Sequence, residues 1–145
     1  MVHALRQVRR VLRRGGTLID IRPDRFRDPT RRRARLPRVG WRSGRGEVAA
    51  GRLDKTAANL RRHRAATRSL HEAVRRGEFV LATTETFTFR YYFRDLDALD
   101  AFLRTRWVSS ILSKRVRSRL TALRRRAGGE IVVAEPVRLN VLRKA

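Results

Sequence analysis

The chain has 145 residues, enough for one domain with a single hydrophobic core. It contains no cysteine, which excludes a disulfide framework and cysteine-ligated metal sites. Apolar residues make up 41% of it, and no apolar run approaches the ~18 residues that a membrane-spanning helix requires. The basic, periodic segment 1–16 is unlike a secretory signal, so we expect a soluble cytoplasmic protein that does not enter a membrane.

Charge is the most unusual property of the chain. Basic residues number 37 against 13 acidic residues, a formal net charge of +24, and all but three of the basic residues are arginines. Such a field attracts nucleic acid, anionic lipid and acidic proteins at low salt. The alternative is a codon bias towards arginine that enriches solvated surfaces, because net charge reports a binding tendency and not a fold.

The first predicted elements are a helix and a strand. Apolar residues recur at helical spacing over 4–12, and the pair Gly15-Gly16 predicts the end of that helix. The nearly all-apolar segment 17–21 predicts a short strand, of the kind usually covered on both faces.

A long basic excursion follows this strand. Residues 22–46 are rich in Arg, Pro and Gly, which predicts a surface loop, part of it mobile, with a short strand near Val39 and Trp41. The segment 47–53 predicts a weak strand.

The second half alternates helices and long strands. Asp54 predicts the N-cap of a helix that runs to about residue 76. Alternation over 79–93 predicts the clearest strand of the chain, with its odd positions on the core face. Asp95 predicts the N-cap of a helix to about residue 107.

The last predicted elements are a helix over about 110–126, with Ser109-Ser110 as its N-cap, and a strand over 130–143. Pro136 predicts an edge position or a bulge in that strand, because proline cannot donate a ladder hydrogen bond. The whole pattern predicts a single α/β or α+β domain over 1–145. We expect about three to four helices and a small mixed, largely antiparallel sheet of about four to five strands.

The segment 5–21 resembles a signature of class I S-adenosylmethionine-dependent methyltransferases. In that family a helix ends in Arg-Val-Leu-x-Pro-Gly-Gly and leads into the fifth strand of a Rossmann-like sheet. Here Arg14 takes the place of the family's proline, and the matching residues are Arg10, Val11, Leu12, Gly15 and Gly16. The glycines serve the reversal from helix to strand and do not touch the methyl group.

The order of the later elements is also similar to the family. After its fifth strand, the family has an excursion, a helix, a long sixth strand, a connection and an antiparallel seventh strand. Segments 79–93 and 130–143 take the last two places. The resemblance therefore implies the C-terminal half of a Rossmann-like methyltransferase.

The resemblance also implies that the cofactor site is missing. The family binds S-adenosylmethionine through a glycine-rich turn after its first strand and an acidic residue at the end of its second strand. The signature begins here at Leu5, so those elements have no place before it. Gly44 and Gly46 lack the strand and helix that would make a binding turn. We therefore expect no cofactor-binding residue and no cofactor.

The function implied is that of a degenerate or accessory subunit, of uncharacterised role, that cannot bind S-adenosylmethionine or transfer methyl groups alone. An active methyltransferase is the alternative if a missing segment or a partner supplies the N-terminal half together with the cofactor.

No cluster in the sequence predicts catalytic or metal chemistry, so the catalytic residues stay unknown. His63 and His71 lie two turns, about 12 Å, apart on one predicted helix, too far for one metal ion. Asp20 and Asp24 lie near the carboxyl end of the first strand, where open α/β sheets place ligands. Ion pairs with the surrounding arginines are the favoured interpretation of these two acids.

Aromatic residues gather towards the end of the segment 79–93. Such a set could stack bases, as in single-strand binders, but alternation assigns most of it to the core, with Tyr92 as the exception. The set comprises Phe87, Phe89, Tyr91, Tyr92 and Phe93.

Two hypotheses concern partners. Without a fourth strand the edge of the fifth is unpaired, so we expect a homodimer or a partner chain to cover the strand edge near Leu18–Ile21. The alternative is a basic nucleic-acid-binding protein whose affinity falls steeply with salt. Its candidate contacts to nucleic acid or other anions are Arg31, Arg32, Arg33 and Arg35.

Overall fold

The computed structural model describes residues 2–28, 30, 33–126 and 128–145. The chain divides into two compact units. Unit 1 comprises Met1–Arg35, Leu60–Phe87 and Pro136–Ala145, and unit 2 comprises Leu36–Asn59 and Thr88–Glu135.

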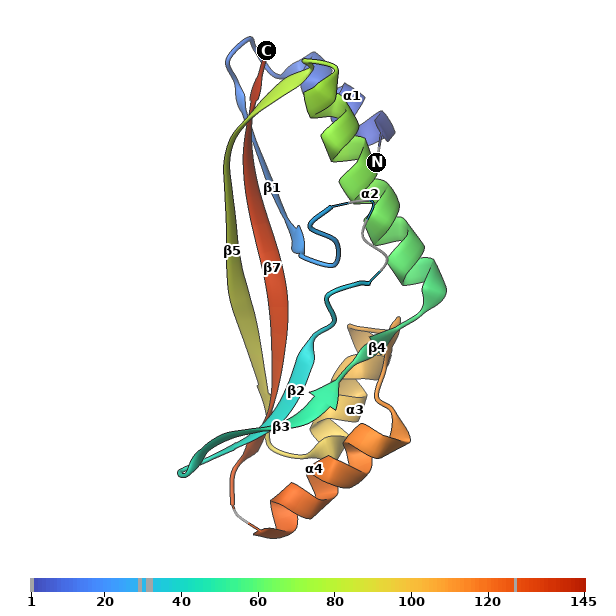
Figure 1. The fold of residues 1–145 in the computed structure, drawn as a ribbon, viewed down its shortest axis with the longest axis vertical. Helices are drawn as coiled ribbons and strands as arrows, with labels where there is room; N and C mark the ends of the chain where they lie inside the picture. Colours follow the sequence, from blue (N-terminus) through green and yellow to red (C-terminus); the bar gives the residue numbers. More distant parts are fainter. Residues whose placement is uncertain (1, 29, 31–32, 127) are drawn as a thin grey trace. The chain divides into compact units, whose positions relative to one another are not determined.

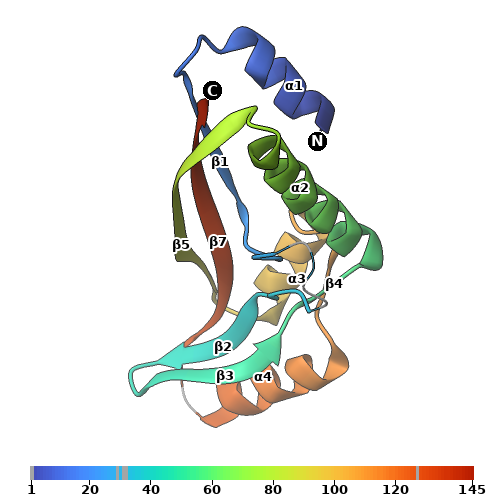
Figure 2. The same cartoon turned by 45° about the horizontal axis from the view of Figure 1, so that its top comes forward.

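The elements of unit 1 are two helices and three strands (Figures 1 and 2). They are α1 (Val2–Val11), β1 (Thr17–Pro23), most of α2 (Ala57–Arg75), the first part of β5 (Phe79–Phe93) and the last part of β7 (Glu130–Lys144). β1 pairs antiparallel with β7, and β5 also pairs with β7. Helices α1 and α2 lie on the same side of these strands (Figure 2).

A small core joins the two helices to the sheet of unit 1. Apolar periodicity places one stripe of α1 and one of α2 towards the strands. The buried members of the core are Leu5, Leu70, Ala73, Phe79 and Leu142. Leu18 of β1 packs against them, so its side of the sheet is the side that the helices cover.

Unit 2 is built on a hairpin and two helices. It contains β2 (Arg38–Ser43), β3 (Gly46–Arg52), β4 (Asp54–Lys55), α3 (Leu96–Thr105), β6 (Ser110–Ile111) and α4 (Lys114–Arg126), with the remaining parts of β5 and β7. β2 pairs antiparallel with β3 and with the start of β7, and α4 packs on the hairpin. Its separate core holds Val39, Trp41, Leu53, Leu99, Leu120 and Ile131 among others.

The predicted fold class is confirmed. The described residues contain four helices, a five-stranded sheet and a two-stranded sheet, and the pairings whose register is defined are antiparallel. The expected strands over 79–93 and 130–143 and the short strand near Val39 and Trp41 are all present. Asp95 caps α3 as expected, accepting a hydrogen bond from the Ala98 N–H at 2.8 Å.

Two predicted N-caps are wrong. Asp54 lies in β4 and Ser110 lies in β6, and these two short strands pair with each other. The helices begin later: Thr56 Oγ1 accepts from the Asn59 N–H at 3.3 Å, and Ser113 Oγ accepts from the Val116 N–H at 3.4 Å. Asp54 and Ser110 therefore lie in paired strands, although both residue types are also suited to capping a helix.

Of the two positions predicted for Pro136, an edge strand or a bulge, the edge strand is wrong, because β7 pairs with β1, β2 and β5. Towards β1, its pairing ends at Val137, and towards β2 it begins at Ala134. The Pro136 carbonyl accepts from the Asp24 N–H at 2.7 Å. The nitrogen of a strand residue points to the same side as its carbonyl, so the Pro136 nitrogen faces the stretch between the β1 and β2 pairings, where no ladder hydrogen bond is needed. A proline is tolerated here because β7 changes partner at this residue.

Candidate interaction surface

The turn between α1 and β1 carries the motif residues that resemble the methyltransferase signature. Gly15 has φ +73°, and a Cβ on Gly16 would lie 2.8 Å from the Arg13 carbonyl oxygen. The Gly15 N–H donates to the Lys144 carbonyl at 3.0 Å, and the Lys144 N–H donates to the Gly16 carbonyl at 2.9 Å. The glycines therefore bring the start of β1 against the end of β7.

The other motif residues have structural surroundings. Arg10 is exposed and Val11 is 74% exposed, whereas Leu12 packs against the core of unit 1. The Leu12 N–H closes the last turn of α1 on the Val8 carbonyl at 3.0 Å. The motif thus fixes the approach of a helix to a strand.

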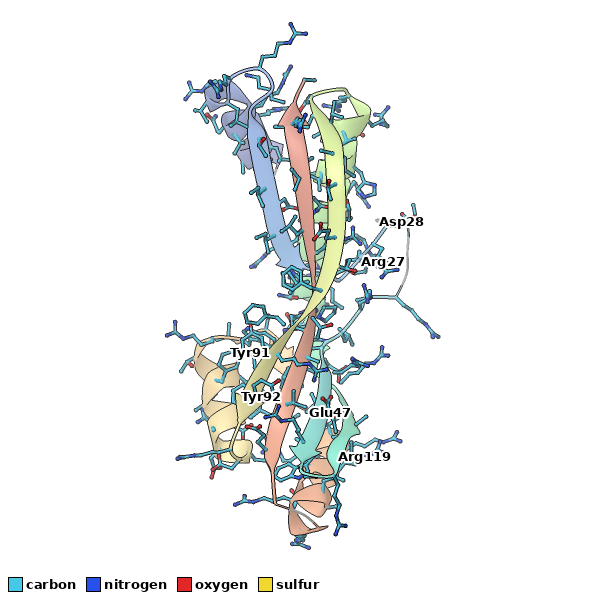
Figure 3. The ribbon with its side chains drawn as sticks, turned by 90° about the vertical axis from the view of Figure 1, so that its left-hand side faces the viewer. Arg27, Asp28, Glu47, Tyr91, Tyr92 and Arg119 are labelled. Carbon is cyan, nitrogen blue, oxygen red and sulfur yellow. The ribbon has the colours of Figure 1, made fainter. Side chains whose placement is uncertain are left out.

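One face of the unit 1 sheet is apolar and uncovered. The register places Ile19 opposite Val141 and Ile21 opposite Leu139, so these four side chains share a face. It is the face opposite Leu18, and therefore opposite α1 and α2. Ile19 and Ile21 are each 59% exposed. We call Ile19, Ile21, Leu139 and Val141 the open face. Figure 3 shows the strands of the sheet in front and the helices behind them.

The open face overturns the expectation that the first strand is covered on both faces. Apolar residues on both sides of a strand are typical of burial on both sides. In β1, however, only Leu18, Asp20 and Arg22 face the helices, and the described part of the chain holds no layer over the isoleucines.

β1 is also an edge strand. It pairs with β7 and stands at the end of the strand order, so none of the described strands lies on its other side. The expected free edge near Leu18–Ile21 is therefore present in the described chain. Unpaired N–H and C=O groups on such an edge are a template for another strand.

β5 is more exposed than its alternation predicts. All residues of 80–90 are exposed, including Leu81 at 44%, Phe87 at 43% and Phe89 at 52%. The predicted core positions of these three are wrong. Leu81 and Thr84 line the same cavity, so the two-residue alternation is interrupted between them.

The end of β5 behaves as predicted. Tyr91 and Phe93 pack against the core of unit 2, and their rings lie 5.4 and 5.2 Å from the Phe102 ring. Tyr92 is the expected exception, 44% exposed, with the Arg42 guanidinium 4.5 Å from its ring centre. The five aromatic residues therefore do not form one exposed row that could stack bases, because Tyr91 and Phe93 pack against the core while the other three are exposed.

A polar chain crosses the helix-covered face of the unit 1 sheet. Thr84 Oγ1 donates to Asn140 Oδ1 at 3.0 Å, and Asn140 Nδ2 donates to Asp20 Oδ2 at 2.8 Å. Asp20 in turn pairs with Arg22 Nε at 3.1 Å. Burial lowers the pKa of Arg22; Asp20 partly offsets this, and Arg138 adds repulsion. These hydrogen bonds connect β5, β7 and β1 through their side chains.

Asp24 is the centre of a buried ion-pair cluster. Its carboxylate lies 2.6 Å from Arg138 Nη2 and 3.7 Å from Arg27 Nε, and it also contacts Arg35. The Asp24 side chain is fully buried and that of Arg138 is 10% exposed. The favoured interpretation of the two acids as arginine partners agrees with these contacts.

The predicted anion contacts are separated by their surroundings. Arg31 and Arg32 lie outside the described residues. Arg33 is exposed, whereas Arg35 is half-buried and engaged with Asp24.

A basic surface that the loop-based hypothesis did not include lies on α4, which has no acidic residue. Its exposed cations are Lys114, Arg115, Arg119, Arg124 and Arg125.

No metal centre is evident in the part of the chain that the structure describes. It contains no group of three His, Asp or Glu residues placed to hold an ion. Helices long and apolar enough to span a membrane are absent from the same residues.

Comparison of the chain with protein-family models, with curated proteins and with solved structures gives no match.

Proposed function

We propose that the chain is the C-terminal half of a Rossmann-like methyltransferase fold and works as a degenerate or accessory subunit. The observation that carries this proposal is the unfinished side of unit 1, where a free β1 edge meets the open face. A sheet with these two features needs a further strand and a further layer. Both are what the N-terminal half of such a fold would supply.

The order of elements supports the proposal. β1 follows the motif of residues 10–16 and is followed by an excursion, by α2 and by the long strand β5. A connection containing α3 and α4 then leads to β7, which runs antiparallel to β1. This is the order of the last three strands of the family that the motif resembles.

The proposed subunit has no cofactor site of its own. Gly44 and Gly46 lie at the tip of the β2–β3 hairpin, between two antiparallel strands, where a strand and a helix would be needed. A partner chain that carries the N-terminal half would make the assembly an active methyltransferase. The same proposal places the subunit in the cytoplasm, in keeping with its lack of cysteine.

Calorimetric titration tests the cofactor part of the proposal. S-adenosylmethionine and its demethylated product are titrated into the protein at about 0.5 M salt, which screens nonspecific attraction to a chain of this charge. We expect no saturable heat with either compound. Saturable micromolar binding would contradict the proposal and indicate that the chain forms a cofactor site by itself.

A second candidate function is nucleic-acid binding, favoured by the acid-free, exposed cationic surface of α4. Figure 3 labels one of its residues, Arg119. A cation that binds phosphate releases counterions, so removing one such side chain lowers the salt slope of binding by about one. The variant Arg115→Gln/Arg119→Gln should therefore bind a single-stranded oligonucleotide more weakly and with a salt slope smaller by about two.

The matched control is Arg75→Gln/Arg76→Gln, which removes the same charge from residues that already pair with Glu72. It should change affinity much less. Equal decreases in affinity in the two variants would mean that oligonucleotides respond only to net charge, and this candidate would be abandoned. The triple variant Arg31→Ala/Arg32→Ala/Arg33→Ala tests the loop in the same assay.

A further inference from the structure

Unit 1 contains a cavity of about 500 Å³ under α2, on the side of the sheet away from the open face. Its wall comes from α2, β5, β7 and the segment after β1, and all of these residues belong to unit 1. The cavity therefore does not include the residues of the open face or the β1 edge. Ligand binding there would be independent of association through that face and edge.

The charged side chains of the wall are two arginines. Arg27 and Arg138 line the cavity, and no carboxylate among the described residues does. Asp24, which lies outside the lining, is shared by Arg138, Arg27 and Arg35. Asp24 thus serves three guanidiniums, two of which line the cavity, so the lining itself carries positive charge that an anion would neutralise.

Arg138 is held in place and retains a donor. Nη2 pairs with Asp24, and Nη1 donates to the Arg27 carbonyl at 3.1 Å. Its Nε is buried and has no hydrogen-bond partner among the described atoms. A buried N–H without a partner is costly, so a ligand oxygen that reached it would be bound with a fixed geometry.

The rest of the wall is apolar or neutral. Leu70 and Val74 come from successive turns of α2, and Leu81 comes from the start of β5. Thr84 and Asn140 already satisfy each other and Asp20, so they form a fixed, uncharged floor. A ligand that fills the cavity must therefore combine an anionic head with an apolar body.

We propose that this cavity binds a small amphiphilic carboxylate, with its head at Arg27 and Arg138 and its alkyl or aromatic body along Leu70, Val74 and Leu81. Arginine recognises a carboxylate through paired N–H donors, which a spherical or uncharged ligand cannot use as well. The apolar wall distinguishes such a ligand from inorganic anions, which have no body to bury.

Isothermal titration with decanoate, below its micelle concentration and at about 0.5 M salt, tests the proposal directly. We expect saturable binding of one decanoate per chain. Decanol, which lacks the charge, and sulfate, which lacks the body, should each bind at least tenfold more weakly. Equal binding of decanol would overturn the role of the arginines, and absence of saturable decanoate binding would overturn the site.

Matched variants then locate the ligand. Arg27 is largely exposed, so Arg27→Gln should fold normally and weaken decanoate binding about tenfold, as expected when a charge-assisted hydrogen bond is removed. The control Arg68→Gln removes the same charge from an exposed position of α2 outside the cavity lining. A similar weakening in the control would show that decanoate responds to net charge alone.

The apolar end has its own pair of variants. Leu81→Glu places a carboxylate in the wall and should repel decanoate, lowering affinity more than tenfold. Val80→Glu makes the same change on the neighbouring residue, which is 56% exposed and does not line the cavity. Equal effects of the two variants would place the ligand elsewhere, and a selective effect of Leu81→Glu supports the cavity.

Discussion

At the scale of single residues, the fold of unit 1 depends on how it neutralises buried arginines. Asp24 is 2% exposed and is the carboxylate that meets Arg138, which is 8% exposed. The two residues come from segments far apart in the sequence, β7 and the residues after β1. The ion pair therefore fixes a contact that no local pattern encodes.

Removing this carboxylate should be strongly destabilising. In Asp24→Asn the shape is kept but Arg138 stays buried without its counter-charge, a change that costs about 3–5 kcal/mol. The free energy of unfolding, measured by urea titration, should fall by that amount. The control Asp54→Asn alters an exposed acid of β4 and should change it by less than about 0.5 kcal/mol. Equal changes in both variants would contradict the central role of Asp24.

A second residue-scale prediction concerns pH. Asp100 accepts two hydrogen bonds from Arg117, at 2.7 and 2.9 Å, and these bonds lower the pKa of Asp100. A lowered pKa in the folded state means that the pair stabilises the fold above the ordinary carboxyl pKa. That contribution is lost as the pH falls through the folded pKa.

Both partners are partly exposed, so the pair should contribute only about 0.5 kcal/mol at neutral pH. The unfolding free energy of Asp100→Asn is compared with that of the unaltered chain from about pH 7 down to about pH 2. The difference should shrink to zero at the acidic end. A difference that grows towards acid would contradict this direction of the pKa shift.

At the scale of elements, a glycine sets how closely α4 packs on the hairpin of unit 2. Gly51 has φ +154°, and a Cβ there would lie 2.5 Å from Val116 Cγ2. Gly51→Ala should therefore destabilise unit 2 by about 1–3 kcal/mol, from overpacking together with backbone strain. Gly44→Ala, at the hairpin tip with nothing within 4 Å, is the control. Thermal unfolding of both variants checks this, and a neutral Gly51→Ala would refute the close packing.

The elements that the sequence predicted correctly are those where periodicity and local chemistry agree, such as the strand over 79–93 and the helix capped by Asp95. The two wrong N-caps share one cause. Asp54 and Ser110 are good caps in isolation, but β4 and β6 pair them with each other's strand. Pairing between distant segments overrides a local preference worth only about 1 kcal/mol.

The candidate surfaces were harder to predict. Ile19 and Ile21 suggested burial, because the sequence of a strand does not reveal which of its faces lacks a covering layer. The cavity was not predicted at all, since Arg27, His71 and Arg138 lie far apart in the sequence. A hint was available in the clustering of acids with arginines after the first strand, which correctly indicated ion pairs at Asp24.

At the scale of the whole molecule, the unfinished side of unit 1 and the high net charge make opposite demands. An apolar face and a free strand edge favour association. A net charge of +24 opposes contact between identical chains, more strongly at low salt. Association through β1 should therefore strengthen as salt is added, whereas binding to nucleic acid should weaken.

The mass of the protein in solution, measured by light scattering after gel filtration at about 0.5 M salt, decides whether the open face and the β1 edge associate. We predict a dimer, about twice the 16.9 kDa of one chain, which Ile19→Lys/Ile21→Lys converts to monomer. The control Val48→Lys/Val108→Lys, which alters exposed valines of unit 2, should remain dimeric. A monodisperse monomer would contradict a homodimer through the open face and the β1 edge, and a dimer that persists in the Ile19→Lys/Ile21→Lys variant would show that other residues hold the dimer together.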